Sequence, residues 1–253
     1  MRIKKNKKLN LFYKTSVSMG LCTIIWVSFS WSALNNIFTI NHVIINGNTL
    51  HMDGKYASHA ESLKNLDLWN INLDSVTTTI EQEPFVNAVR ISRKFPSTIQ
   101  IDINERQAIA IINRNPILCI DKDAVLLPTM ENVFELPVPI LTNFIADERR
   151  IDLGKKTKSE TLESATKALN LLRNNYPVLY TNISELRLTK ENEFELILKD
   201  EPTHIYLGKN KIQNKLVILK EFEEVIQGSK QLTDYIYLDL RYVNQIITRE
   251  RKA

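Results

Sequence analysis

Glycine is scarce in this sequence: six of the 253 residues are glycine, whereas average usage of roughly 7% would give about eighteen. The nucleotide-binding loops G-x-G-x-x-G and G-x-x-x-x-G-K-[ST] are absent, and so is a glycine-based nucleophile elbow. The usual phosphate-binding loops are therefore excluded. The composition, 43% hydrophobic and 25% charged, is typical of a globular protein and argues against disorder and against a polytopic membrane protein.

The spacings that would mark a metal or catalytic site are also missing. The four histidines are far apart or badly spaced for a shared ligand set, at His42, His51, His59 and His204. No H-E-x-x-H occurs, so nothing local predicts zinc, and we expect neither a metal nor a cofactor. The acidic residues Glu221, Glu223 and Glu224 are typical of a solvated helix face. The Glu105-Arg106 pair is interpreted as a polar strand end at a domain junction.

Only two cysteines are present, Cys22 and Cys119. Cys22 falls in a long apolar stretch, whereas Cys119 belongs to the apolar run ILCI further along. If the first is in a membrane and the second is exported, they cannot pair. We therefore expect no internal disulfide, a fold that depends on its hydrophobic core, and a buried Cys119 thiol.

Charge is unevenly distributed. Residues 1–14 hold six of the 33 basic residues and no acid, which leaves 27 basic and 29 acidic residues for the rest of the chain. A nucleic-acid binder needs its positive charge on the folded surface. We therefore expect no nucleic-acid partner, although the net charge of the whole chain is +4.

From Thr15 to His42 there is no charged residue. The 22 residues from Val17 to Phe38 would form a helix of about 33 Å, enough for a hydrocarbon core of about 30 Å. We predict a cytoplasmic leader over 1–14 and a transmembrane helix over 15–38, with the remainder exported. A cleaved signal peptide is the alternative, because Ser30-Trp31-Ser32 offers small residues, but the stretch exceeds a typical apolar region of about 7–15 residues. Seven Ser, Thr and Asn residues make the span only modestly hydrophobic.

The first exported unit, 39–107, is expected to have the order β-α-α-β-β. A strand leads to a turn at Gly47-Asn48, and a polar helix then runs through His59 and Leu63. A second helix is predicted to be capped by Asp74 and stopped by Pro84. A hairpin closes the unit, with strands over Val86–Lys94 and 98–106 around Phe95-Pro96-Ser97. The residues Ile99, Ile101 and Ile103 alternate with polar ones, so we expect them to face the core, opposite Val43 or Ile45.

In this order the residues resemble a POTRA (polypeptide-transport-associated) domain. The resemblance is carried by Phe38-x-Ile40-x-x-Val43-x-Ile45-x-Gly47-Asn48, Asn70-Ile71, Leu73, Ile80, Pro84-x-Val86-x-Ala88-Val89, Arg93-x-x-Pro96 and Thr98-Ile99-x-Ile101-x-Ile103-x-Glu105-Arg106. Together with the basic leader and one span, the sequence resembles the FtsQ/DivIB family of bacterial division proteins. The expected fold is therefore α+β.

The second unit, 108–250, is expected to be a mixed β-rich domain with two helices. Strands are predicted at Ala108–Ile112, Ile117–Ile120, Val125–Leu127, Ile183–Leu188, Phe194–Leu198, Thr203–Leu207 and the terminal run from Tyr235. The segment Val138-Pro139-Ile140-Leu141 resembles the short Pro-containing segment found after such a hairpin in the family. The first helix, Thr157–Asn175, has a capping-box pattern at Thr157 and Glu160 and a buried stripe of leucine and alanine. The second, Lys209–Gln227, ends at Gly228.

The resemblance implies scaffolding in the divisome at the division septum of the inner membrane, with no enzymatic activity. It implies FtsB- and FtsL-type single-span partners and, through the POTRA domain, further divisome members. Two alternatives remain: a POTRA-bearing component of outer-membrane protein assembly or secretion, and an exported hydrolase. The first would be expected to have several POTRA units or a β-barrel, and the second is supported only by size and export.

The partner-binding site is expected on the terminal strand. Asp239-Leu240-Arg241-Tyr242 resembles the family's terminal motif, which implies the FtsB-type contact. If this strand lies at a sheet edge, its free backbone groups suit β-augmentation. Tyr242 is the predicted anchor residue, and the other candidate partner-binding residues are Arg241, Leu240 and Tyr237.

Overall fold

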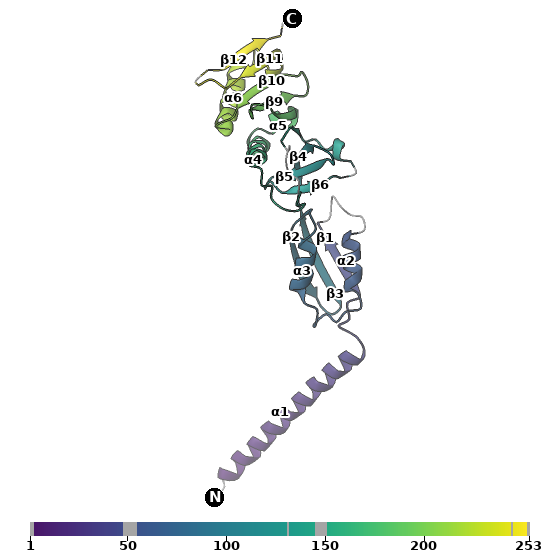
Figure 1. The fold of residues 1–253 in the computed structure, drawn as a ribbon. Coiled ribbons are helices and arrows are strands. Elements are labelled where there is room, and N and C mark those ends of the chain that lie inside the picture. Colours follow the sequence, from purple (N-terminus) through teal and green to yellow (C-terminus); the bar gives the residue numbers. More distant parts are fainter. Residues whose placement is uncertain (1–2, 48–54, 131, 145–150, 244, 252–253) are drawn as a thin grey trace. The chain divides into compact units, whose positions relative to one another are not determined.

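The protein is described by a computed structural model over residues 3–47, 55–130, 132–144, 151–243 and 245–251 (Figure 1). Its contacts divide it into two compact units. Unit 1 comprises residues 1–81 and 87–105, and unit 2 comprises residues 82–86 and 106–253.

Unit 1 begins with a long helix, α1 (Ile3–Leu34). Most of its apolar side chains beyond Leu11 are exposed, including Phe12, Ile25 and Trp26. Across the described residues, no helix combines enough length and apolar character to cross a membrane. The span predicted over 15–38 is therefore not confirmed.

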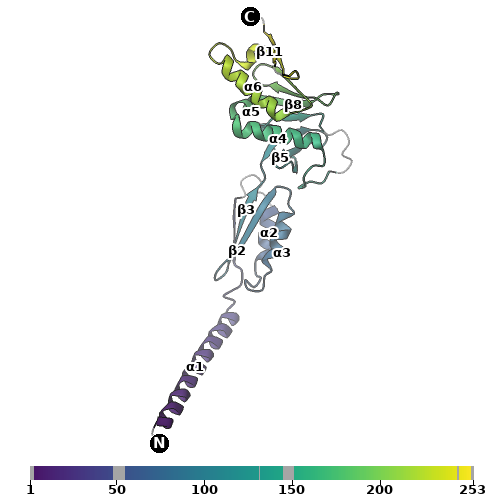
Figure 2. The same ribbon diagram turned by 90° about the vertical axis from the view of Figure 1, so that its left-hand side faces the viewer.

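The rest of unit 1 has the predicted β-α-α-β-β order. It consists of β1 (His42–Asn46), α2 (Lys55–Leu63), α3 (Leu73–Glu81), β2 (Val86–Lys94) and β3 (Thr98–Glu105). The sheet order is β1-β3-β2, with β1 parallel to β3. Figures 1 and 2 show both helices on one face of this sheet.

Strand β3 supplies the core of this sheet. Ile99, Ile101 and Ile103 are all buried, as their alternation predicts. Ile45 of β1 lies opposite Ile101, which confirms the expected pairing. Gly47 ends β1 with a φ of +83°, and a Cβ there would lie 2.0 Å from the carbonyl oxygen of Ile103. This close approach requires glycine.

Unit 2 has a larger sheet. Among the described residues it is nine-stranded, in the order β12-β11-β10-β9-β8-β7-β4-β5-β6. The strands are β4 (Ala108–Asn113), β5 (Leu118–Asp121), β6 (Leu126–Pro128), β7 (Ile140–Thr142), β8 (Ile183–Leu188), β9 (Phe194–Leu198), β10 (His204–Gly208), β11 (Tyr235–Asp239) and β12 (Ile247–Glu250). Short 3-10 helices occupy Val133–Glu135 and Leu232–Asp234.

The main core of unit 2 lies between the sheet and its helices, α4 (Glu160–Asn175), α5 (Pro177–Asn182) and α6 (Ile212–Ile226). The predicted stripe on α4 is buried, at Leu162, Ala165, Leu169 and Leu172. A smaller cluster around Ile111, Leu127 and Val133 includes Cys119, which is fully buried as predicted.

Three local predictions need correction. The α3 helix is capped by Asn72, whose side chain accepts from the Ser75 N–H at 3.1 Å, and not by Asp74. In α4 the cap is Ser159, not Thr157, because the Ser159 hydroxyl accepts from the Leu162 N–H. Two helices were expected in the domain over 108–250, whereas its described residues form three α-helices, α4, α5 and α6. Pro177 ends α4 as expected, but it also starts α5, since proline suits the first turn of a helix.

Candidate partner-binding surface

The terminal run forms two strands, not one. β11 is parallel to β10 on one side and antiparallel to β12 on the other, with Leu238 opposite Thr248 and Asp239 opposite Ile247. The prediction that the strand beginning at Tyr235 lies at the sheet edge is therefore wrong. Among the described residues, no strand lies beyond β12, so this shorter strand forms the edge (Figure 1).

Tyr242 lies in the loop between β11 and β12 and is 51% exposed. Its ring lines a groove of about 430 Å³ between this loop and helix α6. The α6 side of the groove is mainly apolar, with Ile218, Phe222 and Val225 beside one acidic residue, Glu221. Tyr242 is thus held beside an open apolar surface, as a partner-binding residue should be.

Leu240 lines the floor of the same groove, but only 3% of its surface is exposed. It belongs to the main hydrophobic core of unit 2. Its predicted role as a contact residue is corrected accordingly: Leu240 supports the groove from below. The Leu240 N–H donates to the carbonyl oxygen of Tyr206 at 2.9 Å and so extends the ladder of β10 and β11.

Tyr237 and Arg241 do not line this groove; both lie beside Tyr206 of β10. The ring centroid of Tyr237 lies 6.1 Å from that of Tyr206, and the Arg241 guanidinium lies 5.3 Å from the Tyr206 centroid. The neighbours of Tyr206 on β10, Ile205 and Leu207, belong to the main core, so Tyr206 is on the opposite face of the sheet. The structure therefore groups the four predicted residues in two pairs: Tyr242 with Leu240, and Tyr237 with Arg241.

Arg241 forms ion pairs with two carboxylates of unit 2. Its guanidinium donates to Asp239 at 2.6 Å and to Glu193 at 3.2 Å. Burial of the Asp239 carboxylate opposes its ionisation, but the hydrogen bonds from Arg241 outweigh this and hold its pKa below the ordinary value. The same hydrogen bonds raise the pKa of Arg241. Arg241 thus fixes the start of the loop that carries Tyr242.

The contribution of α6 to this surface was not predicted from the sequence. Val225 and Ile218 are exposed apolar residues on a helix whose other side is buried, and an exposed valine on an amphipathic helix is common. The groove exists only because the β11–β12 loop folds beside the helix. The side chains of His51, Lys55 and residues 1–11 fall outside what the structure describes.

In the described part of the chain, no group of three or more His, Cys, Asp or Glu side chains is arranged to hold a metal ion. His204 Nδ1 lies 2.6 Å from a carboxylate oxygen of Glu195, and Arg187 approaches the same carboxylate at 3.5 Å. This small network ties β8, β9 and β10 together across the sheet.

Two parts of the chain match models of known protein families. Residues 38–106 match the model of the POTRA domain, FtsQ-type. The chain is therefore a POTRA-domain protein. Residues 107–249, more than half of its length, match the family described as FtsQ/DivIB, C-terminal related. The chain belongs to the FtsQ/DivIB family.

Several curated relatives carry the name of a cell division protein. The cell division protein FtsQ of Geobacter sp. (strain M21) is 27% identical over 180 residues, which cover 71% of this chain and 64% of the relative. The cell division protein DivIB of Clostridium acetobutylicum is 27% identical over 138 residues, covering 50% of this chain and 55% of the relative. The FtsQ of Geotalea daltonii is 23% identical over 184 residues, or 72% and 65%. The chain thus spans less than two thirds of the length of each of these relatives.

Proposed function

We propose that this protein is a non-enzymatic scaffold of the bacterial division machinery that captures a partner chain at the β12 end of its unit 2 sheet. Family membership supports the division role. The observation that carries the binding proposal is the combination of an open strand edge at β12 with the apolar groove beside α6.

The edge and the groove suit two parts of one partner. A strand added beside β12 would gain affinity from backbone hydrogen bonds, while an apolar side chain placed next to Tyr242 would provide specificity. Arg249 and Glu250 make β12 a polar edge, which guards it against random aggregation. An apolar groove limits productive pairing to partners that also fill it.

The partners we propose are small single-span division proteins of the FtsB and FtsL kind. This assignment rests on the terminal Asp239-Leu240-Arg241-Tyr242 motif and its resemblance to the family. Further divisome members would be recruited through the POTRA domain of unit 1. We retain Tyr242 as the anchor residue, with Arg241 and Tyr237 supporting the loop and sheet around it.

We further propose that α1 anchors the chain in the inner membrane, with residues 1–14 cytoplasmic and the two units outside, and that the protein gathers at the division septum. The support is the run from Thr15 to His42 without charge and the basic leader before it. The proposed anchor is thus defined more by charge distribution than by high hydrophobicity.

The test of the binding proposal is a pair of matched variants of the full chain. Tyr242→Ala is expected to weaken capture of an FtsB-type partner by a factor of about 30 or more, since losses of about 2 kcal/mol mark binding hot spots. Phe134→Ala removes another exposed aromatic residue of unit 2, outside the groove, and should leave capture unchanged. Affinity pull-down from membranes, together with thermal unfolding of both variants, provides the measurement.

Two results would contradict the proposal. Unchanged capture by Tyr242→Ala would place the interface elsewhere. If Tyr242→Ala lowers the melting temperature together with binding, Tyr242 is a core residue and not an anchor. Val225→Asp gives an independent check, because it charges the α6 wall of the groove at a residue that is itself exposed.

A further inference from the structure

Three aromatic residues of unit 1 form a cluster on its surface. Phe38 precedes β1, Trp69 lies in the connection between α2 and α3, and Phe95 lies in the turn between β2 and β3. The ring centroids are 5.8 Å apart for Phe38 and Trp69, and 4.8 Å apart for Trp69 and Phe95. Trp69 is nonetheless 56% exposed and Phe95 54% exposed. We call these three residues the aromatic cluster.

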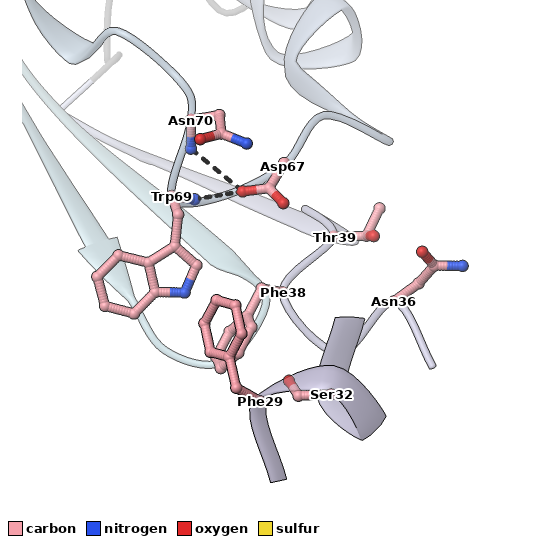
Figure 3. A pocket seen from close by; sticks show the side chains of 8 residues that line it. All are labelled: Phe29, Ser32, Asn36, Phe38, Thr39, Asp67, Trp69 and Asn70. Atoms are coloured by element: carbon pink, nitrogen blue, oxygen red, sulfur yellow. Dashed lines mark hydrogen bonds between the residues drawn. The ribbon is translucent and has the colours of Figure 1, made fainter. Parts of the chain in front are cut away.

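Hydrogen bonds hold the aromatic cluster in place. Arg93 of β2 donates to the carbonyl oxygens of Leu68 and Ile71, at 2.7 Å each, and so ties the Trp69 segment to the hairpin that carries Phe95. The Asp67 carboxylate accepts from the backbone N–H groups of Trp69 and Asn70 (Figure 3). The exposed rings therefore sit on a rigid part of the domain and not on a free loop.

Rigid, exposed aromatic side chains in mutual contact indicate a surface that is covered in use. Scattered exposed apolar residues need no explanation, but a packed trio that includes tryptophan does. Tryptophan combines a large apolar ring with a polar N–H and is enriched at membrane–water interfaces. The exposed Lys94 beside Phe95 adds a positive charge suited to anionic headgroups.

The position of the aromatic cluster along the chain points to its occupant. Phe38 follows the last residue of α1, Leu34, after three intervening residues, so the two are at most about 14 Å apart. Phe38 and Trp69 line a cleft of about 400 Å³ to which Phe29 and Ser32 of α1 also contribute (Figure 3). The end of the helix and the aromatic cluster thus border the same cleft, whose other lining residues, Asn36, Thr39, Asp67 and Asn70, are polar.

We propose that the aromatic cluster lies in the interfacial layer of the membrane that holds α1 and acts as a second anchor point. This inference rests on the proposed membrane anchor. The tether keeps the aromatic cluster close to the lipid surface, so even a weak lipid contact is strengthened by the high effective concentration. Several polar residues in α1 weaken its own interaction with the membrane. A second contact would therefore strengthen membrane binding, because two weak anchors hold a protein stably where one is marginal.

The test uses the three tryptophans of the sequence, Trp26, Trp31 and Trp69, as reporters in the full chain. The variant Trp26→Phe/Trp31→Phe leaves Trp69 alone, and Trp31→Phe/Trp69→Phe leaves Trp26, near the middle of the predicted span. A third variant replaces all three by Phe and adds Phe134→Trp, which places a reporter at an exposed site of unit 2. Each is reconstituted in phosphatidylcholine–phosphatidylglycerol nanodiscs that contain brominated lipids.

We expect bromine near the headgroups to quench Trp69 and bromine deep in the acyl chains to quench Trp26, with little quenching of the Phe134→Trp reporter. Adding Phe95→Ser to the Trp69 reporter should remove most of its quenching, whereas Phe134→Ser should not. Circular dichroism checks that each variant is folded.

The alternatives give different results. If Trp26 is quenched but Trp69 is not, the helix is inserted and the aromatic cluster serves a protein or faces water, which overturns this inference and leaves the anchor intact. If Trp26 is not quenched, both the anchor and this inference fail. Equal quenching of the Phe134→Trp reporter, or no effect of Phe95→Ser, would show general adsorption and overturn the specific contact.

Discussion

Asp121 is a buried charged side chain that links several segments of unit 2. The residue is 2% exposed, and its carboxylate accepts from Arg106 Nη1 at 2.7 Å and from the backbone N–H groups of Asp123 and Val125. Arg106 also contacts the carbonyl oxygens of Phe85 and Val86. The pair therefore joins residues 82–86, the start of the domain and the β5–β6 turn.

We predict that Asp121→Ala lowers the free energy of unfolding of unit 2 by about 3–5 kcal/mol, because it leaves a partly buried arginine without its charge partner. Asp123→Ala is the matched control in the same turn. That carboxylate pairs with Lys122, and both side chains are well exposed, so its loss should cost no more than about 1 kcal/mol. Urea unfolding measures both, and equal losses would contradict a special role for Asp121.

The Cys119 thiol provides a test of burial by pH. Burial disfavours the thiolate and raises the pKa of Cys119 to about 11. The folded state thus keeps a proton that the unfolded chain releases above about pH 8.5. The stabilisation is complete below that pH and should be lost, by roughly 1–3 kcal/mol, as the pH rises to 11.

The matched control for this pH effect is Cys119→Ala, which removes the titrating thiol but retains the other groups, including the buried Tyr180. Its unfolding free energy, measured in urea between pH 8 and 11, should fall less steeply than that of the unaltered protein. Parallel pH profiles would mean that the thiol is accessible to water.

At the scale of elements, strand β3 contributes three buried isoleucines to the core of unit 1. We predict that Ile101→Ala costs about 2–5 kcal/mol, because it removes buried methyl groups and leaves a cavity. The control is Ile44→Ala on the neighbouring strand β1, where the side chain is about half exposed. Thermal unfolding should show a clear loss for the first and little for the second; equal effects would mean that the assigned core face is wrong.

Periodicity predicted the elements better than it predicted their ends. The strands Ile183–Leu188 and Phe194–Leu198 were predicted to the residue, because alternation or a continuous apolar run defines a strand over its whole length. The caps at Asn72 and Ser159 were missed because several polar residues near each helix start could cap it equally well. Choosing among them requires the tertiary position of the first turn.

The candidate partner-binding surface also depends on tertiary features that the sequence pattern does not predict. The exposed Tyr242 was predicted from a resemblance, but the split of its neighbours between two sheet faces was not. The phase of β11 is changed by a register shift between Tyr235 and Tyr237, and such bulges have no reliable sequence pattern here. The reversal into β12 was also missed, because the described loop residues contain neither glycine nor proline to mark a turn.

At the scale of the whole molecule, the two units separate two kinds of contact. The FtsQ-type POTRA domain in unit 1 carries the aromatic cluster, which we assign to the lipid surface, whereas unit 2 carries the edge strand and groove assigned to a protein partner. If these assignments hold, substitutions in one unit should leave the other function intact: Phe95→Ser should not affect partner capture, and Tyr242→Ala should not affect membrane association.

Both assigned contacts require that the two units lie outside the cytoplasm and residues 1–14 inside it, which is the topology that the charge distribution predicts. We expect protease added to spheroplasts to remove residues 39–253 while sparing a tag on residues 1–14, because basic residues remain on the cytoplasmic side. Replacing Lys4, Lys5, Lys7 and Lys8 by Glu should disturb this orientation, whereas replacing the same four by Arg should preserve it. Full protection of the two units from protease would contradict the predicted topology. A mature chain that begins near Ala33 would instead identify a cleaved signal peptide, and the two units would then reach their partner without a permanent anchor.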